Sequence, residues 1–222
     1  MEFLVDGVPR GIEITALVIA GWTGRDRAAV EHHIAELAAI GVKRPRVVPC
    51  FYGVGANLLT TSGEIEVAGE DSSGEVEFVL VSAPGALYVG VGSDHTDRKV
   101  EAYSVTVSKQ MCPKPIGCEL WKFDDVADHW DELVLRSWVT RQETRNLYQE
   151  GSARKILAAP DLIARYLGRR DVLPVGTAMY CGTLTVNGAI CGGECFEIEL
   201  DDPRLERKLQ HTYVARCLDV AD

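Results

Sequence analysis

The spacing of apolar residues separates a helical stretch near the start of the chain from a long series of short strands. Residues 12–20 form a β-rich apolar run, and a turn at residues 21–24 follows it. Apolar residues then recur at helical spacing from Val30 to Ile40, where Gly41 interrupts the pattern. The chain therefore begins with a predicted strand, a turn and a helix.

The remainder of the chain carries strand patterns interrupted by two helical ones. Short alternating or β-branched runs predict strands at residues 47–48, 64–67, 75–81, 86–91 and 102–107. Residues 124–134 and 160–167 have helical spacing, and the second stretch starts with Pro160. Residues 178–200 return to strands and turns. This order predicts an α+β fold with a large, mixed, mainly antiparallel β core.

The composition is that of an ordinary globular protein. Of the 222 residues, 46% are apolar and 25% are charged, and no linker divides them, which predicts one domain. The formal charge of −10 opposes a phosphate backbone, so we expect no nucleic-acid partner. The apolar runs are too short for a bilayer and the start lacks a signal peptide, so we expect a cytoplasmic protein without a membrane partner. The seven cysteines, an odd number without Cys-x-x-Cys, predict reduced thiols.

A candidate metal site begins with Glu75 and Glu77. Alternate residues of a strand project from the same face, so the two carboxylates share one face of the predicted strand. On its own this pattern is more typical of a solvated strand face. Asp94 adds a third carboxylate near the end of the next apolar run. Three converging carboxylates suit Mg²⁺ or Mn²⁺, with Ca²⁺ as a further candidate.

Two other segments offer groups for proton transfer and charge stabilisation. His33 lies on the apolar side of the predicted helix, with Glu36 at its border. One interpretation is that His33 is a residue at the border of the apolar face and Glu36 its surface partner; the other is that the two form a His-Glu pair that activates water. His95, beside Asp94, is the next candidate base. Lys109 is either a solvated lysine or, beside a metal, a group that stabilises an oxyanion.

Several short motifs follow one another in an order that resembles the fumarylacetoacetate hydrolase superfamily, over nearly the whole chain. Each motif is weak alone, but together and in order they are specific. They are Ile19–Thr23, His33-Ile34-Ala35-Glu36, Pro49-Cys50-Phe51, Glu75-Val76-Glu77 with the run to Val81, Asp94-His95-Thr96-Asp97-Arg98, Lys109 with Pro115-Ile116-Gly117, Gln149-Glu150-Gly151, Pro174–Thr177 and Gly182-Thr183-Leu184. Gly21-Trp22-Thr23-Gly24 replaces the usual Gly-x-Asn-Tyr, which indicates an altered pocket and a divergent branch similar to the DUF2848 proteins.

The resemblance implies a fold and a set of site residues. The fold is expected to be a mixed β-sandwich or β-roll with a few flanking helices, in which residues 1–222 form a single catalytic domain and residues 1–45 include the lid strand and helix. The implied metal ligands are Glu75, Glu77 and Asp94, the catalytic residues are His33, Glu36 and Lys109, and the substrate-binding residues are Arg98, Gln149 and Thr183. The implied partners are a small-molecule carboxylate substrate and a second copy in a homodimer.

The implied activity is that of a metal-dependent hydrolase. It would cleave a C–C bond of a 2-oxo or diketo acid resembling an acylpyruvate, with Mg²⁺ or Mn²⁺ as cofactor and water activated by the His-Glu pair. A decarboxylase or hydratase of 2-oxo acids on the same metal site is one alternative. A non-catalytic, metal-stabilised module that binds a small molecule is another.

Overall fold

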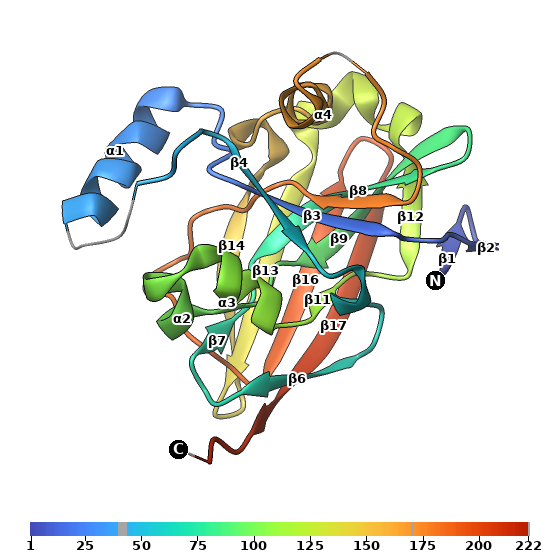
Figure 1. Cartoon of the computed structure of the whole chain (residues 1–222). Helices are drawn as coiled ribbons and strands as arrows, with labels where there is room; N and C mark the ends of the chain where they lie inside the picture. Colours follow the sequence, from blue (N-terminus) through green and yellow to red (C-terminus); the bar gives the residue numbers. More distant parts are fainter. Residues whose placement is uncertain (40–43, 170, 222) are drawn as a thin grey trace.

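The computed structural model of this chain describes residues 1–39, 44–169 and 171–221, without the side chains of His33 and residues 36–39. Helices are few and short in these ranges. They are α1 (Arg27–Ala39), α2 (Arg98–Tyr103), α3 (Val105–Met111) and α4 (Ala159–Leu167), with 3-10 helices η1 (Ala56–Leu58), η2 (Phe123–Asp125), η3 (Ala127–Glu132) and η4 (Ala153–Lys155). Figure 1 shows α1 projecting from the rest of the chain.

The strands form two main sheets. The larger sheet has the order β2-β1-β12-β9-β8-β15-β3-β4, and the smaller has the order β14-β13-β16-β17-β6. In the larger sheet the bounds are β1 (Glu2–Val5), β2 (Val8–Gly11), β3 (Ala16–Gly21), β4 (Cys50–Val54), β8 (Val76–Ala83), β9 (Ala86–Ser93), β12 (Glu119–Lys122) and β15 (Thr177–Tyr180). In the smaller sheet they are β6 (Glu64–Ala68), β13 (Val134–Arg141), β14 (Thr144–Ser152), β16 (Cys195–Asp202) and β17 (Arg207–Leu218). Two short pairs join β5 (Leu59–Thr60) to β11 (Lys114–Pro115) and β7 (Ser72–Ser73) to β10 (Thr96–Asp97).

Strand β8 is central to the packing because both of its faces are buried. Phe78 and Leu80 belong to an apolar cluster that also contains Ile198 of the smaller sheet, so this face packs between the two sheets. Val79 points the opposite way, into a second cluster. The strands of the smaller sheet run across those of the larger one (Figure 1). Glu77 shares the orientation of Val79, so the fold carries a carboxylate into a buried face.

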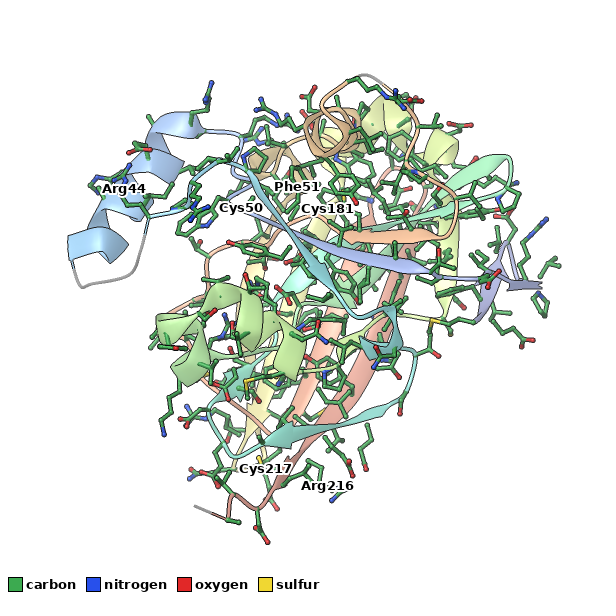
Figure 2. All side chains as sticks on the ribbon, viewed as in Figure 1. Arg44, Cys50, Phe51, Cys181, Arg216 and Cys217 are labelled. Atoms are coloured by element: carbon green, nitrogen blue, oxygen red, sulfur yellow. The ribbon has the colours of Figure 1, made fainter. Side chains whose placement is uncertain are left out.

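The predicted α+β fold with a mixed β core is confirmed, as are several of its elements. The strands predicted at residues 64–67, 75–81 and 86–91 are β6, β8 and β9, and the helices predicted around residues 30–40 and 160–167 are α1 and α4. Across the described ranges, the helices lack the length and apolarity needed to span a bilayer. All seven cysteines are free thiols, and Figure 2 shows Cys217 well separated from Cys50 and Cys181.

Residues 102–107, predicted as a strand, lie in the helices α2 and α3 instead, with Ser104 as the extended residue between them. Asp97 accepts a hydrogen bond from the Val100 N–H (2.8 Å) at the start of α2, and Ser104 accepts one from the Val107 N–H (3.5 Å) at the start of α3. These caps outweigh the β-branched residues of the run. Residues 124–134 form η2 and η3 rather than one α-helix, and residues 47–48 precede β4 instead of forming a strand. Strands β13, β14 and β17 were not predicted.

Candidate metal and active site

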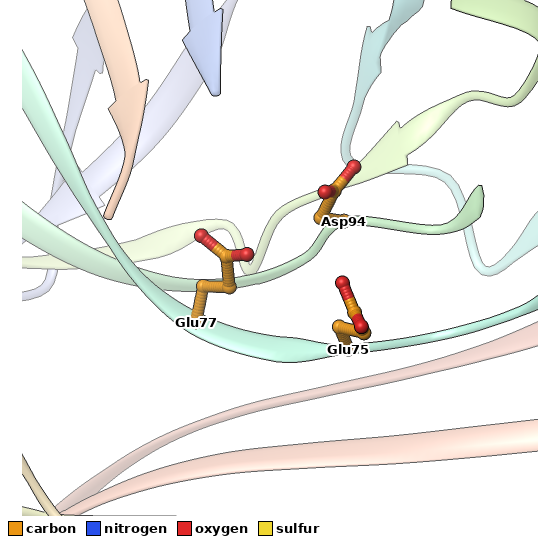
Figure 3. Close-up of side chains that lie close together, drawn as sticks. All are labelled: Glu75, Glu77 and Asp94. Carbon is orange, nitrogen blue, oxygen red and sulfur yellow. The ribbon is translucent and has the colours of Figure 1, made fainter. Parts of the chain in front are cut away.

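The hairpin of β8 and β9 brings the three predicted carboxylates together. Val76 lies opposite Ser93, so Glu75, which precedes β8, and Asp94, which follows β9, are at the same end of the hairpin. The Asp94 N–H donates to the Glu75 carbonyl oxygen at 3.0 Å. Each of Glu75, Glu77 and Asp94 offers a carboxylate oxygen within 4.8 Å of the other two (Figure 3). The predicted convergence is confirmed.

Each carboxylate also contacts a donor of the protein. The Gly182 N–H donates to Glu77 Oε2 at 2.6 Å, and Arg98 Nη2 lies 3.2 Å from Glu75 Oε1. Asp94, which is fully buried, has two lysine partners. Lys109 Nζ donates to its Oδ2, and Lys114 Nζ lies 3.1 Å from its Oδ1.

Burial and mutual repulsion make ionisation of the two glutamates unfavourable. Burial, together with the charge of Asp94, raises the pKa of Glu77 well above its usual value. Burial also raises the pKa of Glu75, although the Arg98 guanidinium opposes it. Burial alone would raise the pKa of Asp94 too, but the two lysine ammonium groups hold it below its usual range. A divalent cation among these carboxylates would relieve their repulsion.

Lys109 is part of this cluster and not a solvated lysine. Helix α3 carries Ser108 and Lys109 on its buried side, and the Lys109 side chain is only 7% exposed. Its Nζ lies 5.9 Å from the ring centroid of Tyr52. Burial would lower the pKa of Lys109, but the Asp94 carboxylate raises it above the ordinary value, so the ammonium stays charged.

The three residues predicted to bind substrate lie at the start of β8. Arg98 donates to Ser73 Oγ (2.6 Å) and Glu101 Oε2 (2.7 Å) besides its contact with Glu75. Thr183 Oγ1 donates to the Val76 carbonyl oxygen at 2.8 Å. In these positions Arg98 and Thr183 support the carboxylate-bearing strand, and their contact with a substrate stays a prediction.

Gln149, also predicted to bind substrate, is fully buried and makes four hydrogen bonds through its amide group. The amide oxygen accepts from the Val76 N–H and from Ser137 Oγ, both at 2.9 Å. The amide nitrogen donates to Thr183 Oγ1 (2.8 Å) and the Leu184 carbonyl oxygen (2.7 Å). The whole amide is thus engaged with the protein around β8, and its role toward a substrate also stays a prediction.

The candidate bases differ in how far the structure describes them. His33 and Glu36 lie on α1, but their side chains are outside the described part, so the His-Glu pair stays a prediction. His95 is fully buried, with Nδ1 3.0 Å from Tyr213 Oη and Nε2 2.9 Å from Ser72 Oγ. Burial lowers the pKa of His95 to about 3, which makes it a poor base.

Comparison with known proteins identifies the family of this chain. The family model described as "Protein of unknown function (DUF2848)" matches residues 20–213. The chain belongs to the DUF2848 family. No curated protein matches it. The match runs from the end of β3 into β17, so it includes the carboxylates, Lys109 and α1.

Solved structures show that this DUF2848 protein has the fold of the fumarylacetoacetate hydrolase superfamily. A Burkholderia cenocepacia protein provisionally assigned as a fumarylpyruvate hydrolase is 19% identical, with a TM-score of 0.65 over 98% of this chain and 95% of that one. A fumarylacetoacetate hydrolase family protein from Yersinia pestis CO92, also provisionally assigned, is 16% identical (TM-score 0.68; 96% and 100%). A 2-keto-3-deoxy-D-arabinonate dehydratase is 16% identical (TM-score 0.66; 96% and 76%). The predicted resemblance is confirmed as a shared fold.

Sequence reasoning missed two groups of the DUF2848 site. Lys114 is completely buried against Asp94, yet it stands between two prolines in a segment with no periodic pattern that could indicate its direction. The Gly182 N–H reaches Glu77 from a residue more than a hundred positions away in the chain. The motif Gly182-Thr183-Leu184 indicated this segment but gave Gly182 no role toward Glu77. The structure shows Gly182 with a φ of +98°, a conformation that favours glycine.

The donor set fits a hard divalent cation. Among the described residues, the cluster consists of carboxylates alone, without a thiolate or an imidazole. Mg²⁺, Mn²⁺ and Ca²⁺ prefer such oxygen ligands. One oxygen of Glu77 contacts an N–H group, one oxygen of Glu75 contacts a guanidinium group, and both oxygens of Asp94 contact ammonium groups. Such outer contacts orient metal ligands in proteins.

Proposed function

We propose that this protein is a divalent-metal-dependent enzyme of 2-oxo acids, and that it hydrolyses a C–C bond of an acylpyruvate-like diketo acid. The observation that carries the proposal is the convergence of Glu75, Glu77 and Asp94 beside the buried ammonium of Lys109. Lysine is not needed to hold a metal, so its burial against a carboxylate supports chemistry rather than binding alone. Mg²⁺ or Mn²⁺ is the proposed cofactor.

The proposed mechanism assigns a separate role to each group. A 2-oxo acid would chelate the bound cation, which would supply stabilisation of the developing enolate charge. The carboxylates of Glu75, Glu77 and Asp94 hold the cation, and the Lys109 ammonium stabilises negative charge on the oxygen of the attacked carbonyl. The imidazole of His33, oriented by Glu36, takes a proton from the attacking water and returns it to the carbon that leaves as an enolate. This role requires α1 to lie over the carboxylates during the reaction.

Product analysis tests the proposal. The purified protein, loaded with Mg²⁺ or Mn²⁺ or treated with a chelator, is incubated with acylpyruvates, oxaloacetate and 2-keto-3-deoxy acids. We expect metal-dependent release of pyruvate together with the cleaved carboxylic acid. Carbon dioxide would indicate a decarboxylase. Loss or addition of water would indicate a dehydratase or hydratase, which the likeness to the dehydratase structure favours as second candidate. No turnover over the whole panel would contradict an enzymatic function and favour a binding module.

A matched pair of variants links activity to the carboxylates. Glu77→Gln should lower Mn²⁺ affinity by more than the roughly 10- to 100-fold typical of losing an outer contact, and should abolish turnover that excess metal partly restores. Glu66→Gln is the control, because Glu64-Ile65-Glu66 is also a Glu-x-Glu motif on a strand. The carboxylates of Glu64 and Glu66 are exposed and pair with Arg216, so Glu66→Gln should not change metal binding.

A further inference from the structure

Lys114 is a buried cation that the proposed reaction does not use. Its side chain is fully buried, with Nζ 3.1 Å from Asp94 Oδ1 and donating to the His95 carbonyl oxygen at 2.5 Å. Its own carbonyl oxygen accepts a hydrogen bond from Tyr180 Oη at 3.0 Å, and it forms β11, which pairs with β5. These contacts hold both ends of the residue.

Lys109, the other partner of Asp94, is held less firmly. It lies near the end of the short helix α3, its side chain keeps a small exposed fraction of 7%, and its ammonium has the Tyr52 ring as a second neighbour. Lys109 donates to Asp94 Oδ2, whereas Lys114 contacts Asp94 Oδ1. If a cation takes an oxygen from Asp94, Oδ2 is therefore the oxygen that becomes free.

Glu75 and Glu77 each contact a donor through one oxygen, which is the arrangement Asp94 reaches once Lys109 leaves Oδ2. The Gly182 N–H holds Glu77 Oε2, and Arg98 lies against Glu75 Oε1. One oxygen of each carboxylate is thus left for a cation. Three single oxygens leave half of an octahedron for water and a chelating substrate, which suits Mg²⁺ and Mn²⁺. Ca²⁺ takes six to eight oxygens and often binds carboxylates through both of them, so it loses most when the second oxygen is blocked.

We propose that Lys114 is a specificity-determining residue of the metal site: by holding Asp94 Oδ1 it restricts Asp94 to one ligand oxygen and disfavours Ca²⁺. This inference rests on the proposed function, because it requires that the cluster binds a divalent cation. Lys109 then gives up Oδ2 on metal binding, and its ammonium becomes available to the substrate.

Metal binding to the purified protein, measured by calorimetry with Mn²⁺, Mg²⁺ and Ca²⁺, tests the proposal without a substrate. Lys114→Met removes the ammonium from Oδ1 and leaves there the neutral Thr96 hydroxyl (3.3 Å), which also donates to the Asp94 carbonyl oxygen (3.1 Å). The variant should shift the ratio of Ca²⁺ to Mn²⁺ affinity toward Ca²⁺ by roughly tenfold or more, the size of effect that outer contacts have on metal sites. Lys109→Met is the matched control. It removes an equal charge from the same carboxylate but leaves Oδ1 occupied, so both affinities should rise together and the ratio should stay constant.

A measurement on the unchanged protein covers the case in which Lys114→Met does not fold. In a crystal structure with Mn²⁺, Lys114 Nζ should remain within hydrogen-bond distance of Asp94 Oδ1 while Lys109 leaves Oδ2. Coordination through both oxygens of Asp94, with Lys114 displaced, would overturn the proposal. So would an unchanged affinity ratio in Lys114→Met, and in both cases the metal site itself would stand. A protein that binds none of the three cations would overturn the proposed function as well.

Discussion

Gly182 connects the metal site to the turn before α1, and alanine at this position should damage both. Its φ of +98° costs a residue with a Cβ about 1–2 kcal/mol. A Cβ there would overlap Thr23 Oγ1 and lie 3.0 Å from Thr23 Cβ, and Thr23 is only 4% exposed. Overpacking of this kind costs about 1–3 kcal/mol. Adding the two effects, Gly182→Ala should lower the free energy of unfolding by about 2–5 kcal/mol.

Gly188→Ala is a control that separates the two contributions. Gly188 has a φ of +88°, but a Cβ there would meet no atom within 4 Å. Gly188→Ala should therefore show only the backbone cost of about 1–2 kcal/mol. For a chain of this length, each kcal/mol corresponds to about 2–4 °C in Tm, so calorimetry can resolve the difference between the variants.

Two further measurements connect the stability loss to the contact itself. Thr23→Ala in the Gly182→Ala background removes the overlapping hydroxyl and should restore part of the lost stability, which a double-mutant cycle measures. Because the Gly182 N–H holds Glu77 Oε2, Gly182→Ala should also weaken Mn²⁺ binding, whereas Gly188→Ala should not. Equal melting temperatures for Gly182→Ala and Gly188→Ala would refute the packing argument.

Three other predictions address the base, a charged histidine and a buried amide. His33→Ala should leave Mn²⁺ affinity intact and lower turnover roughly 10²- to 10⁴-fold; unchanged turnover would place the base elsewhere. Burial lowers the pKa of His129, but hydrogen bonds to Asp128 (2.6 Å) and Asp202 (2.9 Å) raise it above its usual value. The protonated His129 therefore contributes its full share to the free energy of unfolding below about pH 6.5, and this share is lost as the pH rises through the raised pKa. In urea unfolding, His129→Gln should lose more stability in acid than at high pH. A loss that does not depend on pH would contradict this prediction. Gln149→Leu should lower the free energy of unfolding by about 3 kcal/mol or more, because its buried hydrogen-bond partners are left unpaired. The control Gln110→Leu, at an exposed glutamine, should lower it by under about 1 kcal/mol. Similar losses in the two variants would refute the structural role of Gln149.

Local sequence patterns were sufficient to predict the helices and strands whose residues alone carry a clear helical or alternating pattern. The alternation in residues 75–81 and 86–91 predicted β8 and β9, and the same alternation put Glu75 and Glu77 on one face. Pro160 and the apolar spacing after it predicted α4. The order of the short motifs predicted the shared fold, which the structural comparisons confirm.

Elements that depend on distant partners were not predicted. Strand β13 alternates half-buried and buried positions, but its half-buried positions mix Val134 and Trp138 with Arg136 and Thr140, so the sequence shows no clear polar face. In β14 Tyr148 and Gln149 are the buried residues, and they are neighbours rather than alternate positions. The burial in β13 becomes apparent only when β16 pairs beside it. Residues 102–107 have the β-branched side chains of a strand. Capping by Asp97 and Ser104 makes them helical, and α3 then directs Lys109 into the site.

Only the tertiary structure determines which of several similar acidic motifs forms the candidate metal site. The chain contains three Glu-x-Glu motifs, which begin at Glu64, Glu75 and Glu197; the first and third lie within β6 and β16, and the second begins one residue before β8. The first is exposed and pairs with Arg216, and the glutamates of the third pair with arginines of the smaller sheet. Among the described residues, the second motif is the one whose glutamates form a cluster with a third carboxylate, Asp94, which the β8–β9 hairpin brings to them. Alternation along a strand can place two carboxylates on one face, but a third carboxylate, a buried Lys114 and the Gly182 N–H come from segments that only folding brings together.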